Sequence, residues 1–179
     1  MSTERNRLSS EAYADAPKLG VRFVLENIRS GQNVGAFFRT GDAFRIEGID
    51  LCGYTAHPPH RDILKSALGA SEHVAWRGHE SAAEAIAVLR SEGFHIAVIE
   101  QTDSSIMLQD WSPKSGEKWA LVFGNEVRGV ELNTTEAADI SIEIPQFGVK
   151  QSLNVSVCGG MVLWEAARKM GLPQVNSVG

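Results

Sequence analysis

The sequence IPQFGVKQSLNVSVCGGMVLW, residues 144–164, joins the end of an apolar strand to a loop and then to a long apolar segment. Ser152 and Asn154 stand where that segment should begin a helix, and neither side chain suits a hydrophobic core. The start of a helix has unpaired backbone N–H groups and a partial positive charge, so a serine there can cap the helix and can also hold a polar ligand group. From this stretch alone, the capping role and the functional role remain equally open.

Apolar segments of strand length alternate with segments of helical period in the rest of the chain. We expect strands at residues 21–28, 49–55, 73–76, 94–101, 118–126 and 139–145. Helices are expected from Asn33 as N-cap to just before Gly48, over 80–93 and over 152–170, whereas residues 57–70 predict a loop or a broken helix. This alternation indicates a parallel α/β sheet with helices on both faces, which binds ligands beyond the carboxyl ends of its strands.

Length and composition indicate one domain. A chain of 179 residues with 43% hydrophobic content can bury a substantial core. We expect an N-terminal arm over 1–18, the main domain over 19–171 and a flexible tail over 172–179. The sequence lacks both a long apolar span and the apolar core of a signal peptide, so we expect a cytoplasmic protein with no membrane partner and two reduced, buried thiols at Cys52 and Cys158.

Charge is distributed unevenly along the chain. The net charge of −5 argues against a protein that holds nucleic acid by bulk electrostatics. Basic residues nevertheless gather in the first third, at Arg22, Arg29, Arg39, Arg45, Arg61 and Lys65. Acidic residues gather between Glu126 and Glu143. A local basic patch is therefore compatible with the net charge.

Polar residues follow three of the expected strands. They are Asn33 and Arg39 after the first strand, Gly124, Asn125 and Glu126 after another, and Ser152 and Asn154 after the last. Each has an ordinary structural explanation as a helix cap, a solvated helix face or a turn residue. Their joint occurrence at strand ends that should meet at one edge of the sheet favours a functional site.

Other site classes lack support in the sequence. FGNEVRG (123–129) has no Lys-Ser/Thr pair after its glycines, and no GxGxxG follows a strand, which argues against the common nucleotide-binding loops. His57 and His60 flank two prolines, but no cluster of further ligands completes a coordination shell, so we expect no metal. The absence of GxSxG leaves hydrolase chemistry unsupported.

In order and spacing, residues 27–49, 121–130 and 144–166 resemble the three motifs of the SpoU/TrmH class of RNA ribose 2′-O-methyltransferases, in the SPOUT superfamily. The resemblance covers roughly residues 21–170. It implies a parallel sheet flanked by helices with a C-terminal deep trefoil knot, an exception to the general absence of knots. It also implies S-adenosyl-L-methionine bound in the knot and a homodimer whose active sites lie at the interface.

The resemblance assigns roles to individual residues. Catalytic roles fall on Asn33, Arg39, Glu126, Ser152 and Asn154. Cofactor contacts fall on Glu100, Gly124, Ile144 and Leu153, with Glu100 matched only through the alignment of its strand end. The apolar residues 153–164 are assigned to the knot core and to the dimer contact.

The implied reaction is an in-line attack of a ribose 2′-hydroxyl on the methyl carbon of a sulfonium. The hydroxyl must lose its proton, and the family proposal makes Arg39 the base. A guanidinium with a pKa above about 12 rarely releases its proton in proteins, which favours Arg39 as an orienting group that can hold an RNA phosphate. The sequence leaves both roles open.

We expect tRNA as the substrate in preference to rRNA. EQT (100–102) and SLNVSV (152–157) resemble the tRNA-guanosine branch, and only a short segment precedes the first strand, whereas many rRNA-directed members carry an extra N-terminal domain. The alternatives are an rRNA methyltransferase, a knotted RNA-binding protein without catalysis and a flavodoxin-like small-molecule binder, of which the last has no phosphate-loop residues to support it.

Overall fold

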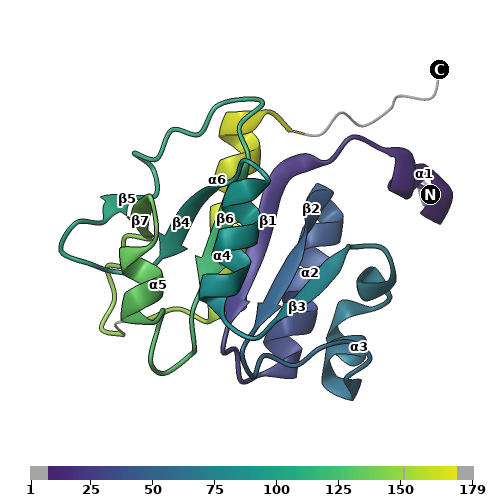
Figure 1. Ribbon diagram of the computed structural model, residues 1–179, viewed down its shortest axis with the longest axis horizontal. Coiled ribbons are helices and arrows are strands. Elements are labelled where there is room, and N and C mark those ends of the chain that lie inside the picture. Colours follow the sequence, from purple (N-terminus) through teal and green to yellow (C-terminus); the bar gives the residue numbers. More distant parts are fainter. Residues whose placement is uncertain (1–7, 151, 173–179) are drawn as a thin grey trace.

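The computed structural model describes residues 8–150 and 152–172. Within them, seven strands form one parallel sheet in the order β3-β2-β1-β6-β4-β7-β5 (Figure 1). The strands are β1 (Leu19–Glu26), β2 (Ile46–Cys52), β3 (Trp76–His79), β4 (His95–Ile99), β5 (Ile106–Met107), β6 (Trp119–Phe123) and β7 (Ile140–Glu143). The predicted parallel α/β sheet is confirmed.

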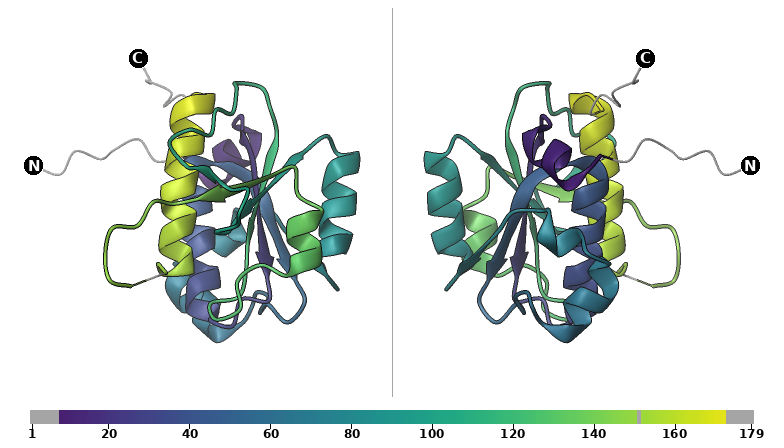
Figure 2. Two further views of the ribbon diagram at one scale, coloured as in Figure 1. Left: turned by 90° about the vertical axis from the view of Figure 1, so that its left-hand side faces the viewer. Right: turned by 90° about the vertical axis from the view of Figure 1, so that its right-hand side faces the viewer.

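Helices cover both faces of this sheet. They are α1 (Ser10–Asp15), α2 (Gly31–Phe44), α3 (Arg61–Ala67), α4 (Ala82–Ser91), α5 (Leu132–Glu136) and α6 (Val155–Met170), with a 3₁₀ turn at Ala70–Glu72. Figure 2 shows α2 and α6 on one face and α4 and α5 on the other. The sheet is thus buried on both sides, which explains why β1 and β6 are almost continuous apolar runs.

Several boundaries differ from the prediction. The first strand begins at Leu19, and the short strand expected at 73–76 lies at Trp76–His79, because the 3₁₀ turn occupies the residues just before it. Residues 57–70 contain the complete helix α3. The elements β5 and α5 were not expected, because segments of two and five residues are too short to show a period.

The core joins α2 and α6 to the centre of the sheet. The rings of Phe23, Phe37 and Phe123 contact one another with centroids 5.0–5.6 Å apart. Gly159 on α6 faces the Phe37 ring, and a Cβ there would overlap it. The lack of a side chain at Gly159 therefore lets α6 approach α2 closely.

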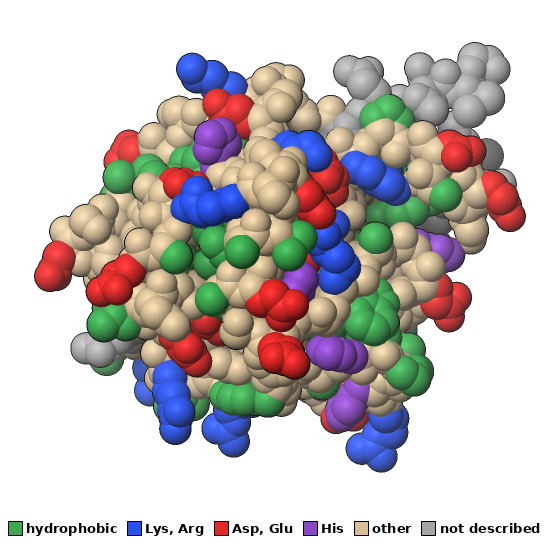
Figure 3. All heavy atoms as spheres, in the orientation of Figure 1, with side chains coloured by type: hydrophobic (Ala, Val, Ile, Leu, Met, Phe, Trp, Pro, Cys, Tyr) green, Lys and Arg blue, Asp and Glu red, His purple; other side chains and the backbone are tan. Residues whose placement is uncertain are grey.

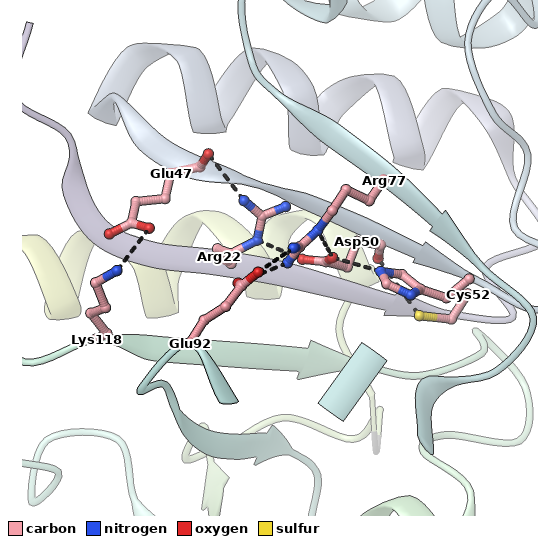
Figure 4. Close-up of polar contacts among 8 residues, drawn as sticks. Arg22, Glu47, Asp50, Cys52, Arg77, Glu92 and Lys118 are labelled. Atoms are coloured by element: carbon pink, nitrogen blue, oxygen red, sulfur yellow. Dashed lines mark hydrogen bonds and ion pairs between the residues drawn. The ribbon is translucent and has the colours of Figure 1, made fainter. Parts of the chain in front are cut away.

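A buried ion network crosslinks the neighbouring strands β1, β2 and β3 (Figure 4). Asp50 on β2 is 0% exposed and accepts hydrogen bonds from Arg22 on β1 (2.6 Å) and Arg77 on β3 (2.8 Å). His79 Nε2 lies 2.8 Å from the same carboxylate, and Arg77 also pairs with Glu92 at 2.6 Å. Three neighbouring strands are thus crosslinked through one carboxylate, whose buried charge is balanced by its partners.

The ends of the chain and the two thiols were also the subject of predictions. The predicted arm contains α1, whose Tyr13 ring lies under the Lys18 ammonium, 3.4 Å from the ring centroid. The predicted tail lies outside the described residues beyond Leu172. Cys52 is buried and Cys158 is only partly buried; both are free thiols, and burial raises the pKa of each. In the described residues, every helix is too short or too polar to cross a membrane.

Candidate functional site

Three separated segments meet at the carboxyl edge of the sheet through Glu126. This glutamate follows β6, and its carboxylate accepts hydrogen bonds from the backbone N–H groups of Arg29 (2.9 Å) and Ser30 (3.1 Å). Its Oε1 also accepts a hydrogen bond from Asn33 Nδ2 at 3.0 Å. The loop after β6 is thereby fixed against the start of α2, as expected for parallel strands that end at the same edge.

The same network continues to the start of α6 through Asn33. Asn154 Nδ2 donates to Asn33 Oδ1 at 3.1 Å, and the Ser156 hydroxyl lies 3.4 Å from the same oxygen. Asn33 therefore uses both ends of its amide, donating to Glu126 and accepting from α6. Three of the sequence-predicted site residues form one hydrogen-bonded series.

The two helix starts differ in detail from the sequence-based expectation. Asn33 was expected to cap α2, but Ser30 is the N-cap and its hydroxyl accepts from the Asn33 N–H. Ser152 was expected to cap α6, but Asn154 is the N-cap and accepts from the N–H groups of Ser156 and Val157. The Asn33 side chain is therefore not used in capping, which leaves it available to join Glu126 to Asn154.

The Glu126 carboxylate is held in its ionised form. Burial acts to raise its pKa, but hydrogen bonds from the backbone of Arg29, from its own backbone, from the Asn33 side chain and from the Ser30 backbone outweigh burial and lower the pKa. Glu126 is therefore a structural anion near neutral pH, and it is poorly suited to act as a proton acceptor.

A cavity of about 330 Å³ opens beside this network. Its walls come from the ends of β4, β6 and β7, from the loop after β6 and from the segment that leads into α6. The predicted site residues that line it are Glu100, Gly124, Glu126, Ile144, Ser152 and Leu153. Asn33, Arg39 and Asn154 are not among the lining residues, so the cavity and the polar network adjoin at Glu126.

Gly124 and Glu100 shape the loop that forms one cavity wall. A Cβ at Gly124 would overlap the backbone of Gly129 and Val130, so only glycine allows the loop to fold back here. The Glu100 carboxylate accepts from the Val130 N–H at 2.9 Å and from the Gln101 N–H at 3.1 Å. Both residues therefore hold the cavity wall in place through contacts within this chain.

Arg39 lies apart from the cavity. It is exposed on α2, and its side chain has no hydrogen bond or ion pair among residues 8–150 and 152–172. Arg39 is six residues after Asn33 on α2. With 3.6 residues per turn, its side chain leaves the helix about 120° around the axis from that of Asn33. Arg39 therefore projects outward, away from the network that contains Asn33.

Two further residues belong to the site: Asn125, which the sequence singled out only as one of the polar residues after a strand, and Ser156, which it did not single out. Asn125, which is buried, accepts from the N–H groups of Val127 and Arg128 and thereby closes the loop after β6. Ser156 donates to Asn154 Oδ1 at 2.7 Å. A signal existed for both, because Asn after a strand-ending glycine favours a turn and a hydroxyl in the first helical turn favours a capping network.

The histidines considered as a metal pair have other contacts. His60 Nδ1 accepts from the Asp62 N–H at 3.3 Å as the N-cap of α3. The His57 ring lies 5.7 Å from the Trp76 ring, between centroids. In the described residues, no group of three or more His, Cys, Asp or Glu side chains is placed to hold a metal ion.

A parallel sheet with a cavity and a polar network beyond its carboxyl ends defines an α/β protein with one ligand site at that edge. The model of the SpoU rRNA Methylase family matches residues 20–164. The chain belongs to this family, and the resemblance recognised in its three motifs is confirmed.

Individual relatives are moderately similar. The chain is 30% identical over 149 residues to a tRNA (guanosine(18)-2′-O)-methyltransferase of Borreliella burgdorferi, covering 83% of this chain and 66% of that protein. It is 32% identical over 146 residues to a 23S rRNA (guanosine-2′-O-)-methyltransferase of Neisseria meningitidis, covering 82% of this chain and 57% of that protein. The chain thus spans less than two thirds of the length of these curated relatives.

A solved structure supports the same fold. The AdoMet-bound rRNA methyltransferase from Sinorhizobium meliloti matches with a TM-score of 0.78 at 25% identity, covering 90% of this chain and 61% of that one. Because the match covers 90% of this chain, the two proteins share the fold that forms the cavity.

Proposed function

We propose that this protein transfers a methyl group from S-adenosyl-L-methionine to a ribose 2′-hydroxyl of RNA. The observation that carries the proposal is the series Glu126, Asn33 and Asn154, which joins the three motif segments through hydrogen bonds of 3.0 and 3.1 Å beside the cavity. Membership of the SpoU family and the similarity to named tRNA and rRNA 2′-O-methyltransferases support it.

The cavity suits S-adenosyl-L-methionine. Ile144 and Leu153 provide apolar surface for an adenosine, and Gly124 lines the same cavity. The carboxylates of Glu100, Glu126 and Glu143 also line the cavity, and negative groups favour a ligand that carries a sulfonium and an ammonium. When bound, the cofactor supplies an electrophilic methyl group whose transfer discharges the sulfonium. This chain's residues bind and orient it, and Ser152 presents a hydroxyl to the same cavity.

A homodimer completes the proposed site. On α6, Val157, Met161 and Trp164 are 52%, 42% and 51% exposed and follow one another at helical spacing. An exposed apolar stripe of this kind indicates a protein interface, and a two-fold axis would bury it against a second copy. Arg39 projects from the outer face of the adjacent helix α2, so a second copy would bring Arg39 toward the partner's cavity.

We favour Arg39 as an orienting group over Arg39 as a base. A guanidinium remains protonated under ordinary conditions, and its fork of N–H donors matches a phosphate or a developing alkoxide. Positioning of the hydroxyl against the methyl carbon supplies much of the rate in such a displacement. Removal of the 2′-hydroxyl proton would then depend on a stabilised alkoxide or on a substrate phosphate.

We also propose that the C-terminal segment forms a deep trefoil knot. The sheet order separates β7 from β6 by β4, yet α6, which follows β7, packs against α2. Residues 144 and 152–153 line the same cavity as the loop 124–129. Mechanical unfolding by pulling on the two ends tests the knot. A knotted chain should stop extending before it reaches about 3.6 Å per residue, and extension to that full length would contradict a knot.

We favour tRNA as the substrate, on the resemblance of residues 100–102 and 152–157 to the tRNA-guanosine branch. An rRNA substrate is the second candidate, because an rRNA relative is equally similar. Such substrates imply action in the cytoplasm.

The test uses tritiated S-adenosylmethionine with total tRNA and with rRNA. Incorporated label should resist alkaline hydrolysis as a dinucleotide, because a 2′-O-methyl group blocks cleavage of the adjoining phosphodiester. Calorimetry with S-adenosylhomocysteine measures cofactor binding separately. Absence of heat at millimolar ligand would contradict the cofactor, and heat without transfer to either RNA would favour a binding protein without catalysis.

A further inference from the structure

Tyr54 presents an aromatic ring to solvent next to the candidate site. It follows β2 and is 61% exposed. Its hydroxyl points inward and accepts a hydrogen bond from Asn125 Nδ2 at 2.8 Å. Asn125 lines the cavity, so one side chain separates the ring from the cavity wall. Because the hydroxyl of Tyr54 is already hydrogen-bonded, the apolar ring makes up most of the solvent-exposed surface of this side chain.

The turn that carries Tyr54 is held by neighbouring loops. The Tyr54 N–H donates to Asn27 Oδ1 at 3.2 Å, and Asn125 Nδ2 also donates to the Asn27 carbonyl at 2.9 Å. The next residue, Thr55, is buried; its hydroxyl accepts from the Ile28 N–H at 3.0 Å. The ring is thus supported from three strand ends, and little conformational entropy remains to be lost when a ligand packs on it.

Two arginines of the same loops have free guanidinium groups. The backbone N–H of Arg29 bonds to Glu126, and the backbone N–H of Arg128 bonds to Asn125. Both side chains are exposed, and in residues 8–150 and 152–172 neither has a hydrogen bond or an ion pair. Figure 3 shows Lys and Arg side chains projecting from the lower edge of the molecule, where β1 ends in Figure 1. Cations therefore project from this edge despite the net charge of −5, beside the carboxylates of Glu126 and Glu131.

We propose that Tyr54 is a stacking platform for an unpaired nucleobase of the RNA substrate, with Arg29 and Arg128 on the flanking phosphates. The inference rests on the proposed function and adds a binding site outside the cofactor cavity. Aromatic rings bind unstacked bases through their faces, and guanidinium groups hold the backbone beside them. A base stacked on Tyr54 would fix the strand next to the cavity, so that the neighbouring ribose reaches the methyl group.

The chemistry of the surface favours RNA over a protein partner. The ring is a single isolated aromatic with cations beside it, whereas a protein interface centres on a cluster of apolar side chains. Such a cluster exists on α6, at the stripe formed by Val157, Met161 and Trp164. The Tyr54 site requires one planar group and two negative charges, which a short single-stranded RNA carries.

Fluorescence anisotropy with the full chain tests this proposal. The probe is a labelled single-stranded RNA of mixed sequence, about ten nucleotides long, together with the same RNA lacking its central bases. Tyr54→Ala should weaken binding of the intact RNA by roughly tenfold or more, while Tyr54→Trp should keep the affinity. The RNA without central bases should bind wild type and Tyr54→Ala with equal affinity. It has no base to stack on the ring, so removal of the ring makes no difference.

Salt dependence distinguishes the arginines from the ring. Arg29→Gln and Arg128→Gln should each reduce the slope of log affinity against log salt by about 0.7, whereas Tyr54→Ala should leave the slope unchanged. Trp76→Ala is the matched control, since Trp76 is an exposed aromatic at the start of β3, the end away from the cavity. It should bind the intact RNA as wild type does.

The outcomes separate this proposal from the proposed function. If wild type binds no RNA, the function itself fails, and the platform fails with it. If wild type binds RNA and Tyr54→Ala binds it equally well, only the platform is overturned. A change in sedimentation caused by Tyr54→Ala would identify the ring as a contact between protein chains and would also overturn the proposal.

Discussion

Asn33 is the residue on which the site depends most directly. Its amide nitrogen donates to Glu126 and its amide oxygen accepts from Asn154. Both ends of the amide are therefore hydrogen-bonded, and the two partners fix its orientation. An amide is the only side chain of this size that can donate to a carboxylate on one side and accept from an amide on the other. This double requirement, rather than helix capping, accounts for an asparagine at this position.

Asn33→Asp should therefore disrupt the site although it preserves shape. A carboxylate at residue 33 would lie about 3 Å from Glu126, and two like charges at that distance cannot both ionise without a large cost. We expect abolished methyl transfer and a loss of roughly 2 kcal/mol in unfolding free energy near pH 7, smaller at pH 4 where one carboxyl is protonated. Gln32→Glu adds the same charge at the exposed neighbouring residue and should leave both measurements close to wild type.

Glu126 predicts a second pH dependence. Its folded-state pKa is lowered, so its contribution to stability is present above the unfolded pKa and is lost as pH falls through the folded one. Glu126→Gln should be less stable than wild type by about 1 kcal/mol at pH 7, and the difference should shrink below about pH 4. Urea unfolding of both proteins at pH 7 and below about pH 4 measures this difference in stability. A difference that grows on acidification would show that the folded-state pKa of Glu126 is raised and not lowered.

At the scale of elements, the carboxyl edge of the sheet is formed by loops that fit closely against one another. Gly124→Ala introduces a Cβ that overlaps the backbone of Gly129 and Val130, so the loop after β6 must move. We expect cofactor affinity to fall by more than tenfold and unfolding free energy to fall by about 1–3 kcal/mol. Calorimetry with S-adenosylhomocysteine measures the first effect. Gly116→Ala serves as the control for cofactor binding. Its positive φ of 85° makes an alanine there strained, so the unfolding free energy should also fall, but nothing lies near the added Cβ and binding should be normal.

The ion network among β1, β2 and β3 gives a prediction about stability alone. Asp50→Ala removes the carboxylate that joins β1, β2 and β3 and leaves Arg22 buried without its partner. We expect a loss of roughly 3–5 kcal/mol by urea unfolding. Glu92→Ala removes only the exposed side of the network and should cost less than about 1 kcal/mol. Equal losses would mean that burial does not govern this network.

Most of the elements and all three motif segments could be predicted from the sequence, because strand and helix periods are local signals. The precise helix starts could not, since Ser30 and Asn33 are both good N-caps and only the tertiary contact with Glu126 decides between them. Ser156 was not singled out although its partner Asn154 is only two residues away. The contact of Asn125 with Tyr54 could not be read from the sequence, because only the fold brings these residues together. Tyr54 gave no signal, because exposure cannot be read from a strand-ending sequence.

At the scale of the whole molecule, we propose that a complete site needs two copies of the chain. The cavity and the polar network lie at the carboxyl edge of each chain's own sheet, while Arg39 lies exposed on α2, the helix that packs against α6. A second copy packed on α6 would cover the stripe and bring one Arg39 toward each cavity. In this proposal the dimer serves catalysis and also buries the apolar stripe.

Mixing two inactive variants tests this arrangement. Arg39→Ala lacks the arginine, and Gly124→Ala lacks a working cavity, so each homodimer should be inactive. Co-expression should give heterodimers in which one cavity is intact and faces an intact Arg39, restoring about a quarter of wild-type activity if subunits pair at random. If Arg39 instead serves its own chain, the intact cavity of the heterodimer lacks an arginine and the cavity that has one is disrupted, so the mixture stays inactive. Met161→Glu added to both chains should abolish the restoration by separating the subunits, because a charge on the apolar stripe opposes its burial.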